Sequence, residues 1–207
     1  LGRVVLRRLM APGDAAVRDD CLLRRAAAAA EDAQAAVAAA QAAFAGWRAT
    51  PISTRARVLN AAAAWLDANV DRIAQGLTRE EGKTLPEAKG EVRRAINIFR
   101  YFAGEGSRMP GHLVPSERDR VHMFAIRKPI GVVGLVTPWN FPSAIPAWKL
   151  APALICGNTV VMKPASAAPL SAWRIMEALH EAGLPKGVAN FVAGSGGELG
   201  QALVEAK

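Results

Sequence analysis

The sequence predicts an α/β protein in which N-terminal helices precede a partial doubly wound parallel sheet. Two observations predict this fold. Residues 26–102 carry apolar side chains at intervals of three or four, as amphipathic helices do. Residues 132–206 alternate short apolar runs with helical patterns, in the order βαβαβα. Because short, continuous apolar runs are typical of parallel strands buried on both faces, this order indicates a nucleotide-binding sheet.

Composition agrees with a globular protein. The 207 residues are 51% hydrophobic and 21% charged, and no run of 18 or more apolar residues predicts a transmembrane helix. The net charge is +8, but the arginines are scattered along helical segments without interleaved aromatic residues. This distribution favours a basic, solvated surface over nucleic-acid binding, and no nucleic-acid or membrane partner is expected. A cytoplasmic location is the default expectation.

The cysteines and histidines indicate neither disulfides nor metal binding. Cys21 and Cys156 lie far apart in the sequence, and the three histidines are dispersed. We therefore predict no disulfide framework and no metal site.

Leu1–Arg25 has no sustained periodicity and does not begin with methionine. We expect this segment to be disordered or to be non-native sequence, such as the product of a shifted reading frame. Residues 26–110 then form the helical N-terminal part of the protein.

The helical part divides into three segments. The first begins at Ala26, with Gly46 marking its end. The second follows Ser53 as N-cap and is expected to break near Asn69. The third starts at a capping box with proline in the first turn, Thr84–Glu87. Glu80 and Glu81 are neighbours that diverge on a helix, so a solvated face is expected for them.

Residues 111–130 are expected to bridge the helical part and the sheet. Gly104–Pro115 is rich in glycine and proline and predicts a loop. Arg120–Arg127 predicts a strand, and its apolar residues on both faces favour covered surfaces.

Residues 131–207 form the nucleotide-binding part. The strands are expected at Val132–Val136, Thr159–Met162 and Val188–Val192, and the helices at Ser143–Leu154, Ser171–Ala182 and Glu198–Ala206. Asn140 comes just after the first strand and Lys163 just after the second. Since ligands of open α/β sheets bind beyond the carboxyl ends of the strands, both side chains should face one crevice.

Two motifs in this region resemble the aldehyde dehydrogenase superfamily. They are TPWNFP at residues 137–142 and GNTVVMKPAS at residues 157–166. The stretch between them is similar to that of semialdehyde dehydrogenases, which act on small acidic aldehydes. The resemblance implies an atypical Rossmann domain, a β-hairpin used for oligomerisation, and NAD(P)-dependent oxidation of an aldehyde through a cysteine thioester. The resemblance covers residues 26–207, which corresponds to less than half of a full-length member. For the complete protein, the resemblance implies a homo-oligomer.

The resemblance also implies roles for individual residues. Asn140 matches the side-chain donor of the oxyanion hole, and Lys149 matches a lysine near the active site, although a surface lysine is the alternative. The cofactor, NADP or NAD, would contact Thr137, Pro138, Trp139, Asn140, Lys163, Pro164, Ala165, Ser166, Gly196 and Gly200. Gly194–Gly200 does not fit G-x-G-x-x-G, so a plain glycine-rich turn stays open as the other interpretation.

Ser166 bears on the choice of cofactor. Many NAD-preferring members carry glutamate there, which binds the ribose hydroxyls and repels a 2′-phosphate. A serine leaves room and a donor, which favours NADP or dual use, with NAD as the alternative.

The chain departs from the family in one respect. Cys156 precedes Gly157 at the end of a helix and is interpreted as structural, and the motifs of the family's nucleophile and general base do not occur. We therefore expect the N-terminal portion of an aldehyde dehydrogenase, inactive by itself. The alternative is an inactive truncated chain that binds nucleotide or associates with full-length subunits.

Overall fold

A parallel sheet of three strands lies between two layers of helices. The computed structural model describes residues 30–206, so the expectation for residues 1–25 lies outside the described part. In chain order, the elements are α3 (Ala30–Ala49), α4 (Ile52–Ala68), α5 (Val70–Glu81), α6 (Leu85–Glu105), η1 (Gly106–Arg108), β1 (His112–Pro115), β2 (His122–Ala125), β3 (Val132–Val136), α7 (Ala144–Ile155), β4 (Thr159–Lys163), α8 (Pro169–Glu181), β5 (Ala189–Phe191) and α9 (Glu198–Glu205).

The sheet has the order β3-β4-β5, and both strand pairs are parallel. The central strand β4 is buried along its whole length. Successive side chains of a strand point to opposite faces, so Val160 and Met162 join the core on one face and Val161 joins the smaller cluster on the other. The predicted α/β class with a partial doubly wound sheet is confirmed.

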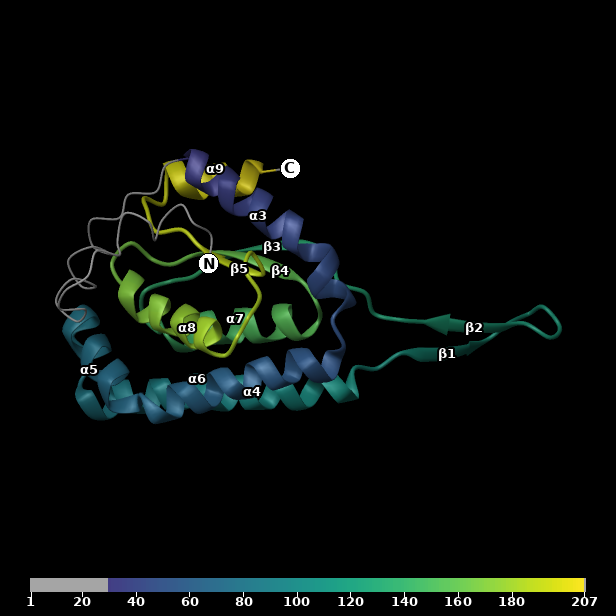
Figure 1. Ribbon diagram of the computed structural model, residues 1–207, viewed down its shortest axis with the longest axis horizontal. Helices are drawn as coiled ribbons and strands as arrows, with labels where there is room; N and C mark the ends of the chain where they lie inside the picture. Colours follow the sequence, from purple (N-terminus) through teal and green to yellow (C-terminus); the bar gives the residue numbers. More distant parts are fainter. Residues whose placement is uncertain (1–29, 207) are drawn as a thin grey trace.

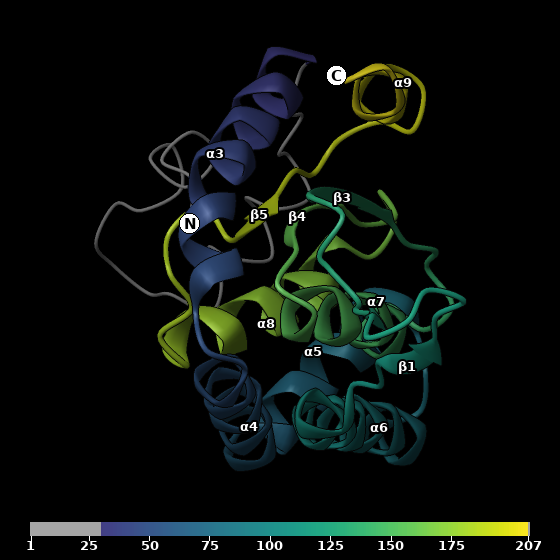
Figure 2. The ribbon, with the colours of Figure 1, turned by 90° about the vertical axis from the view of Figure 1, so that its right-hand side faces the viewer.

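The helices form layers on both sides of this sheet. α3 and α9 cover one face, α7 and α8 cover the other, and α4 and α6 lie beyond α7 and α8 as a further layer (Figure 1). The view in Figure 2 shows the same order of layers from a second direction. Helices on both faces explain why β4 is a continuous apolar run rather than an alternating one.

The expectation that β3 is buried on both faces is wrong. Leu135 is buried, but Val136 is 56% exposed. The reason is that β3 is an edge strand and that α3, the longer helix on the open face, packs mainly against β4.

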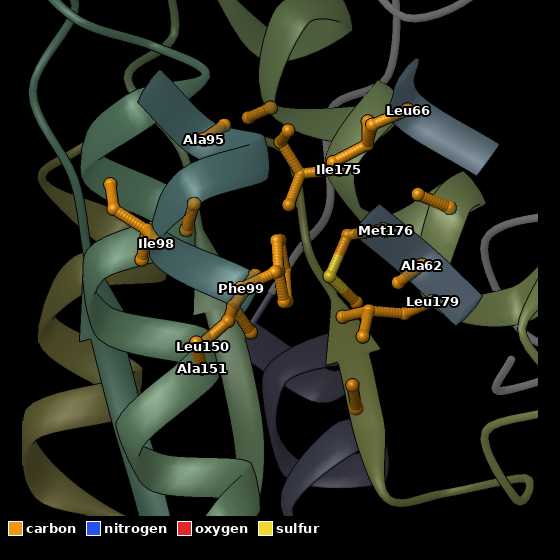
Figure 3. Packing of buried hydrophobic residues seen from close by; sticks show 14 of the residues in the cluster. Ala62, Leu66, Ala95, Ile98, Phe99, Leu150, Ala151, Ile175, Met176 and Leu179 are labelled. Carbon is orange, nitrogen blue, oxygen red and sulfur yellow. The ribbon is translucent and has the colours of Figure 1, made fainter. Parts of the chain in front are cut away.

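The main core lies between the sheet and the outer helices. It brings together apolar side chains of α4, α6, α7 and α8, and Figure 3 shows Phe99, Leu150 and Ile175 among them. All three are fully buried. The helical periodicity of residues 85–102 reflects this packing, because its apolar stripe is the face that α6 turns toward α4 and α7.

Two expected helix ends are wrong. α3 passes through Gly46 and ends at Ala49, because Trp47 must stay on the helix to be buried and to donate from Nε1 to Leu154 O at 3.1 Å. α4 begins at Ile52, so Ser53 is a helical residue and Pro51 takes the N-cap position. The break at Asn69 and the capping box of Thr84 and Glu87 are confirmed.

The hairpin β1–β2 projects away from the rest of the protein (Figure 1). The strands are antiparallel, with Leu113 opposite Phe124. The loop expected at Gly104–Pro115 is wrong, because α6, η1 and β1 occupy most of it. The apolar residues of the hairpin are exposed within the described part of the chain, so their expected covering stays a prediction. Phe124 is 73% exposed. The strands pair only with each other, so neither face of the hairpin meets the described core.

Candidate functional site at the carboxyl edge of the sheet

The site is built around the loop that follows β3. Its first residue, Thr137, donates its backbone N–H to Lys163 O at 3.1 Å, which fixes the loop to the end of β4. Thr137 is buried, and its Oγ1 has no hydrogen-bond partner within residues 30–206. Trp139 and Asn140 are exposed, and no residue of the described part engages the Asn140 carboxamide. The loop therefore presents an indole and a free amide beside an unpartnered hydroxyl.

Two residues of the helical part, one just before α6 and one on it, bind the backbone of this loop. Lys83 Nζ donates to Asn140 O at 3.1 Å and lies 4.4 Å from the centre of the Phe141 ring. Glu91 Oε1 accepts the backbone N–H groups of Ser143 at 2.8 Å and Ala144 at 3.1 Å, at the start of α7. Lys83 Nζ and Glu91 Oε2 are 2.5 Å apart. Sequence reasoning missed both residues, because their partners are distant in sequence.

Lys163 ends β4 and stands level with Val136 in the register of the sheet. It is 3% exposed, and its Nζ donates to Pro164 O at 3.0 Å. Burial lowers the pKa of the Lys163 ammonium. Since no carboxylate of residues 30–206 pairs with it, an anionic or hydroxyl-bearing ligand would compensate this desolvation.

Ser166 connects the β4 loop to the loop after β5. Its hydroxyl donates to Gly194 O at 2.8 Å, so the donor that was expected to be free is engaged. Pro164 is buried, whereas Ala165 is half-buried and Ser166 is exposed. This hydrogen bond brings the glycine-rich loop and α9 to the same edge as Lys163.

The three helices that follow the strands differ at their N-termini. Glu91 occupies the N-terminus of α7, and the Glu80 carboxylate accepts from Leu170 N and Ser171 N, both at 2.7 Å, at that of α8. The expectation of a solvated face for Glu80 is therefore wrong. At α9, Gly196 is exposed, and a Cβ added at Gly196 or Gly200 would meet no atom within 4 Å. Helix N-termini favour anions, and this one has room for a phosphate group.

Cys156 is not part of this constellation. Lys149 is exposed on the second turn of α7, and its place near the active site stays a prediction. Cys156 follows α7 at the end that leads into the first residue of β4, so it lies at the amino edge of the sheet. Burial raises the pKa of the Cys156 thiol, as expected for a structural cysteine rather than a nucleophile.

A groove runs along α6 beside the start of α7. Its volume is about 730 Å³, and it is lined by Gly90, Arg93, Arg94, Asn97, Ile98, Tyr101, Phe102 and Trp148. The Arg94 guanidinium carbon is 5.8 Å from the centre of the Trp148 ring. The groove combines a mainly apolar lining with the guanidinium groups of Arg93 and Arg94.

Among residues 30–206, no three His, Cys, Asp or Glu side chains gather in a way that would hold a metal ion. The same part of the chain contains no helix whose length and hydropathy would let it cross a bilayer.

Comparison with known proteins gives consistent matches. The family model described as the aldehyde dehydrogenase family matches residues 14–207, beginning upstream of residue 26. The α-ketoglutaric semialdehyde dehydrogenase of Bacillus subtilis is 49% identical over 176 residues, which are 85% of this chain and 36% of the relative.

Solved structures agree. An NADP-dependent enzyme of Escherichia coli has a TM-score of 0.82 and 40% identity, covering 84% of this chain and 36% of that one. PnpE in complex with nicotinamide adenine dinucleotide has a TM-score of 0.84 and 41% identity, covering 86% and 37%. The chain thus spans a little over one third of the length of the proteins that it matches.

Proposed function

The chain belongs to the aldehyde dehydrogenase family, and on that premise we propose that it is the N-terminal portion of an NAD(P)-dependent dehydrogenase that oxidises a small acidic semialdehyde. In this proposal it supplies the oxyanion amide and the adenosine side of the cofactor site. The cysteine nucleophile and the general base come from outside this chain.

One observation carries the proposal. The backbone bond from Thr137 to Lys163 holds the loop of Asn140 at the end of β4, at the edge where open α/β sheets bind ligands. Lys163 is buried there, and its ammonium has no carboxylate partner among residues 30–206. A carboxamide at this edge can stabilise a developing oxyanion, and an ammonium can bind a ribose or a phosphate. The resemblance of the two sequence motifs implies the same role for Asn140 as the oxyanion donor and for Lys163 as a cofactor contact.

The cofactor site fits a nicotinamide dinucleotide. Lys163 would bind the adenosine ribose, and Trp139 would line the site. The backbone N–H groups at the exposed N-terminus of α9, near Gly196, would donate to the pyrophosphate. When bound, the nicotinamide ring accepts the hydride that leaves the substrate.

NADP is the favoured form of the cofactor. Position 166 carries no carboxylate that would repel a 2′-phosphate, and Ser166 is exposed, although its hydroxyl is donated to Gly194 O. The similar Escherichia coli enzyme is NADP-dependent, whereas PnpE was solved with nicotinamide adenine dinucleotide.

An acidic aldehyde is the favoured substrate. The groove beside α7 offers the guanidinium groups of Arg93 and Arg94, which suit a carboxylate. The similar Bacillus subtilis protein is named as an α-ketoglutaric semialdehyde dehydrogenase.

The projecting hairpin supports assembly with other subunits. Leu113 and Phe124 stand opposite each other and are both largely exposed, an arrangement that a monomer rarely keeps uncovered. We propose that β1–β2 docks on a second copy of the protein.

The test is the Asn140→Ala variant of the complete enzyme, with Asn60→Ala as the control, since Asn60 is an exposed asparagine on α4. Loss of one oxyanion donor should lower kcat for aldehyde oxidation by about 10²–10³-fold. Nucleotide affinity should change far less than kcat in Asn140→Ala and should stay unchanged in Asn60→Ala. A wild-type kcat in Asn140→Ala would contradict the proposed role.

A further inference from the structure

A buried ion pair underlies the loop that carries Asn140. Glu91 is 4% exposed on α6, and Lys83 lies in the turn between α5 and α6. Both residues lie outside the set to which a catalytic or cofactor role has been assigned. Burying two charges is costly unless their geometry is good and their remaining hydrogen-bonding capacity is used. Here Lys83 and Glu91 use their remaining hydrogen bonds mainly on the backbone of the loop between β3 and α7.

Each end of the pair binds the backbone around Asn140. Glu91 Oε1 accepts from the N–H groups of Ser143 and Ala144, while Oε2 meets Lys83 Nζ at 2.5 Å. The same Nζ donates to Asn140 O at 3.1 Å. The pair therefore links α6 to two points on the chain, one at Asn140 and the other three residues later.

The other contacts of Lys83 strengthen this link. Its Nζ is 3.3 Å from Glu81 Oε2 and 4.4 Å from the centre of the Phe141 ring. Burial lowers the pKa of Lys83, but its bonds to Glu91 and Glu81 outweigh this and raise the pKa overall. The ammonium thus stays charged while it holds the loop.

Within residues 30–206, Lys83 Nζ is the one group that hydrogen-bonds the Asn140 carbonyl. The nearest backbone bonds are Thr137 N to Lys163 O, before it, and Ile145 N to Phe141 O, after it. The residues between have no regular secondary structure. The direction of the Asn140 Cα–Cβ bond consequently depends on the peptide that Lys83 fixes.

We infer that Lys83 and Glu91 are positioning residues for Asn140, fixing its backbone so that its amide meets the oxyanion. This inference rests on the proposed function. Displacement of a catalytic group by about 1 Å can cost about 10²-fold in rate. Loss of the Lys83 ammonium should therefore lower kcat without changing the adenosine side of the site.

The experiment compares three variants of the complete enzyme. Lys83→Met removes the ammonium and leaves the Glu91 charge buried and unpaired. Lys83→Met with Glu91→Gln removes both charges but keeps an acceptor for Ser143 and Ala144. Lys89→Met is the control. Lys89 lies on α6, as Glu91 does, but it pairs with the exposed Asp71 at 2.7 Å.

We expect kcat to fall by roughly 10–100-fold in both Lys83 variants. The double variant should recover much of the thermal stability lost in Lys83→Met, since it leaves no unpaired buried charge. Nucleotide Kd should stay within about twofold of wild type in every variant, a spread of roughly 0.4 kcal/mol. Lys89→Met should keep the wild-type kcat.

Two kinetic results would overturn the inference. Recovery of kcat together with stability in the double variant would show that the pair only stabilises the fold. A parallel loss of kcat and nucleotide affinity would show that the whole edge has collapsed, so that Lys83 has no particular effect on Asn140.

Amide hydrogen exchange separates this inference from the proposed function. In Lys83→Met, the segment 140–145 should exchange at least about tenfold faster, because the bond from Lys83 Nζ to Asn140 O is lost and Glu91 loses the partner that holds its carboxylate in place. Unchanged exchange would overturn the inference even in an active enzyme. If the wild-type enzyme oxidises no aldehyde, the proposed function fails, and the exchange rates still decide whether Lys83 fixes the loop.

Discussion

At the scale of single residues, the proposed cofactor site makes Ser166 a neighbour of the adenosine ribose. We predict that Ser166→Glu shifts the ratio of kcat/KM for NAD over NADP upward by about 10-fold or more, since it adds a charge that repels a 2′-phosphate. Ser166→Ala is the control, because it removes the hydrogen bond to Gly194 O without adding charge. Initial rates with each cofactor measure the ratio. An unchanged ratio in Ser166→Glu would mean that position 166 does not contact the ribose.

Residue-scale reasoning from the sequence succeeded where a functional group follows directly from its strand. Asn140 and Lys163 were predicted to face one crevice because each was expected just after a strand. The backbone bond from Thr137 to Lys163 joins the ends of β3 and β4 at one edge, whereas the common crevice of the two side chains stays a prediction. Lys83 and Glu91 could not be found in this way. Glu91 lies 52 residues from Ser143, and only the packing of α6 against α7 brings them together.

At the scale of elements, two glycines with positive φ test how closely α3 packs against the turn before β5. Gly183 and Gly187 have φ of 77° and 82°. A Cβ at Gly187 would lie 2.7 Å from Ala39 O on α3, whereas one at Gly183 would meet nothing within 4 Å. Gly183→Ala should cost about 1–2 kcal/mol of stability from backbone strain alone.

Gly187→Ala should cost about 1–3 kcal/mol more, because the added methyl group also forces α3 away from the turn. Urea unfolding of both variants measures the difference. Equal losses would contradict the close packing of α3 against the turn before β5.

Elements whose apolar period was clear were predicted well, and their ends less so. The strand β4 and the helices α6 and α8 follow from local pattern, because each buries a continuous face. Gly46 misled the prediction of an end for α3, since the burial of Trp47 outweighs the cost of a glycine within the helix. The burial of β3 was overestimated because an edge position cannot be recognised from the strand's own sequence.

At the scale of the whole molecule, the projecting hairpin is the feature that a single subunit does not explain. We predict that Phe124→Lys lowers the oligomeric state of the complete protein, because it places a charge in an interface expected to be apolar. Val204→Lys is the control, since Val204 is a similarly exposed apolar residue on α9. Light scattering after gel filtration gives the mass. An unchanged mass for Phe124→Lys would exclude the hairpin from the interface.

The central claim is that this chain carries the adenosine side of a nicotinamide cofactor site, and a nucleotide titration tests it most directly. NADP and NAD would be added to wild-type protein, to Lys163→Met and to the control Lys186→Met, with tryptophan fluorescence, to which the exposed Trp139 contributes, as the signal. We predict saturable binding that weakens by about 10–100-fold in Lys163→Met, as expected for the loss of a charged hydrogen bond, and stays unchanged in Lys186→Met. Absence of saturable binding to the wild type, or equal affinity in Lys163→Met, would contradict the account.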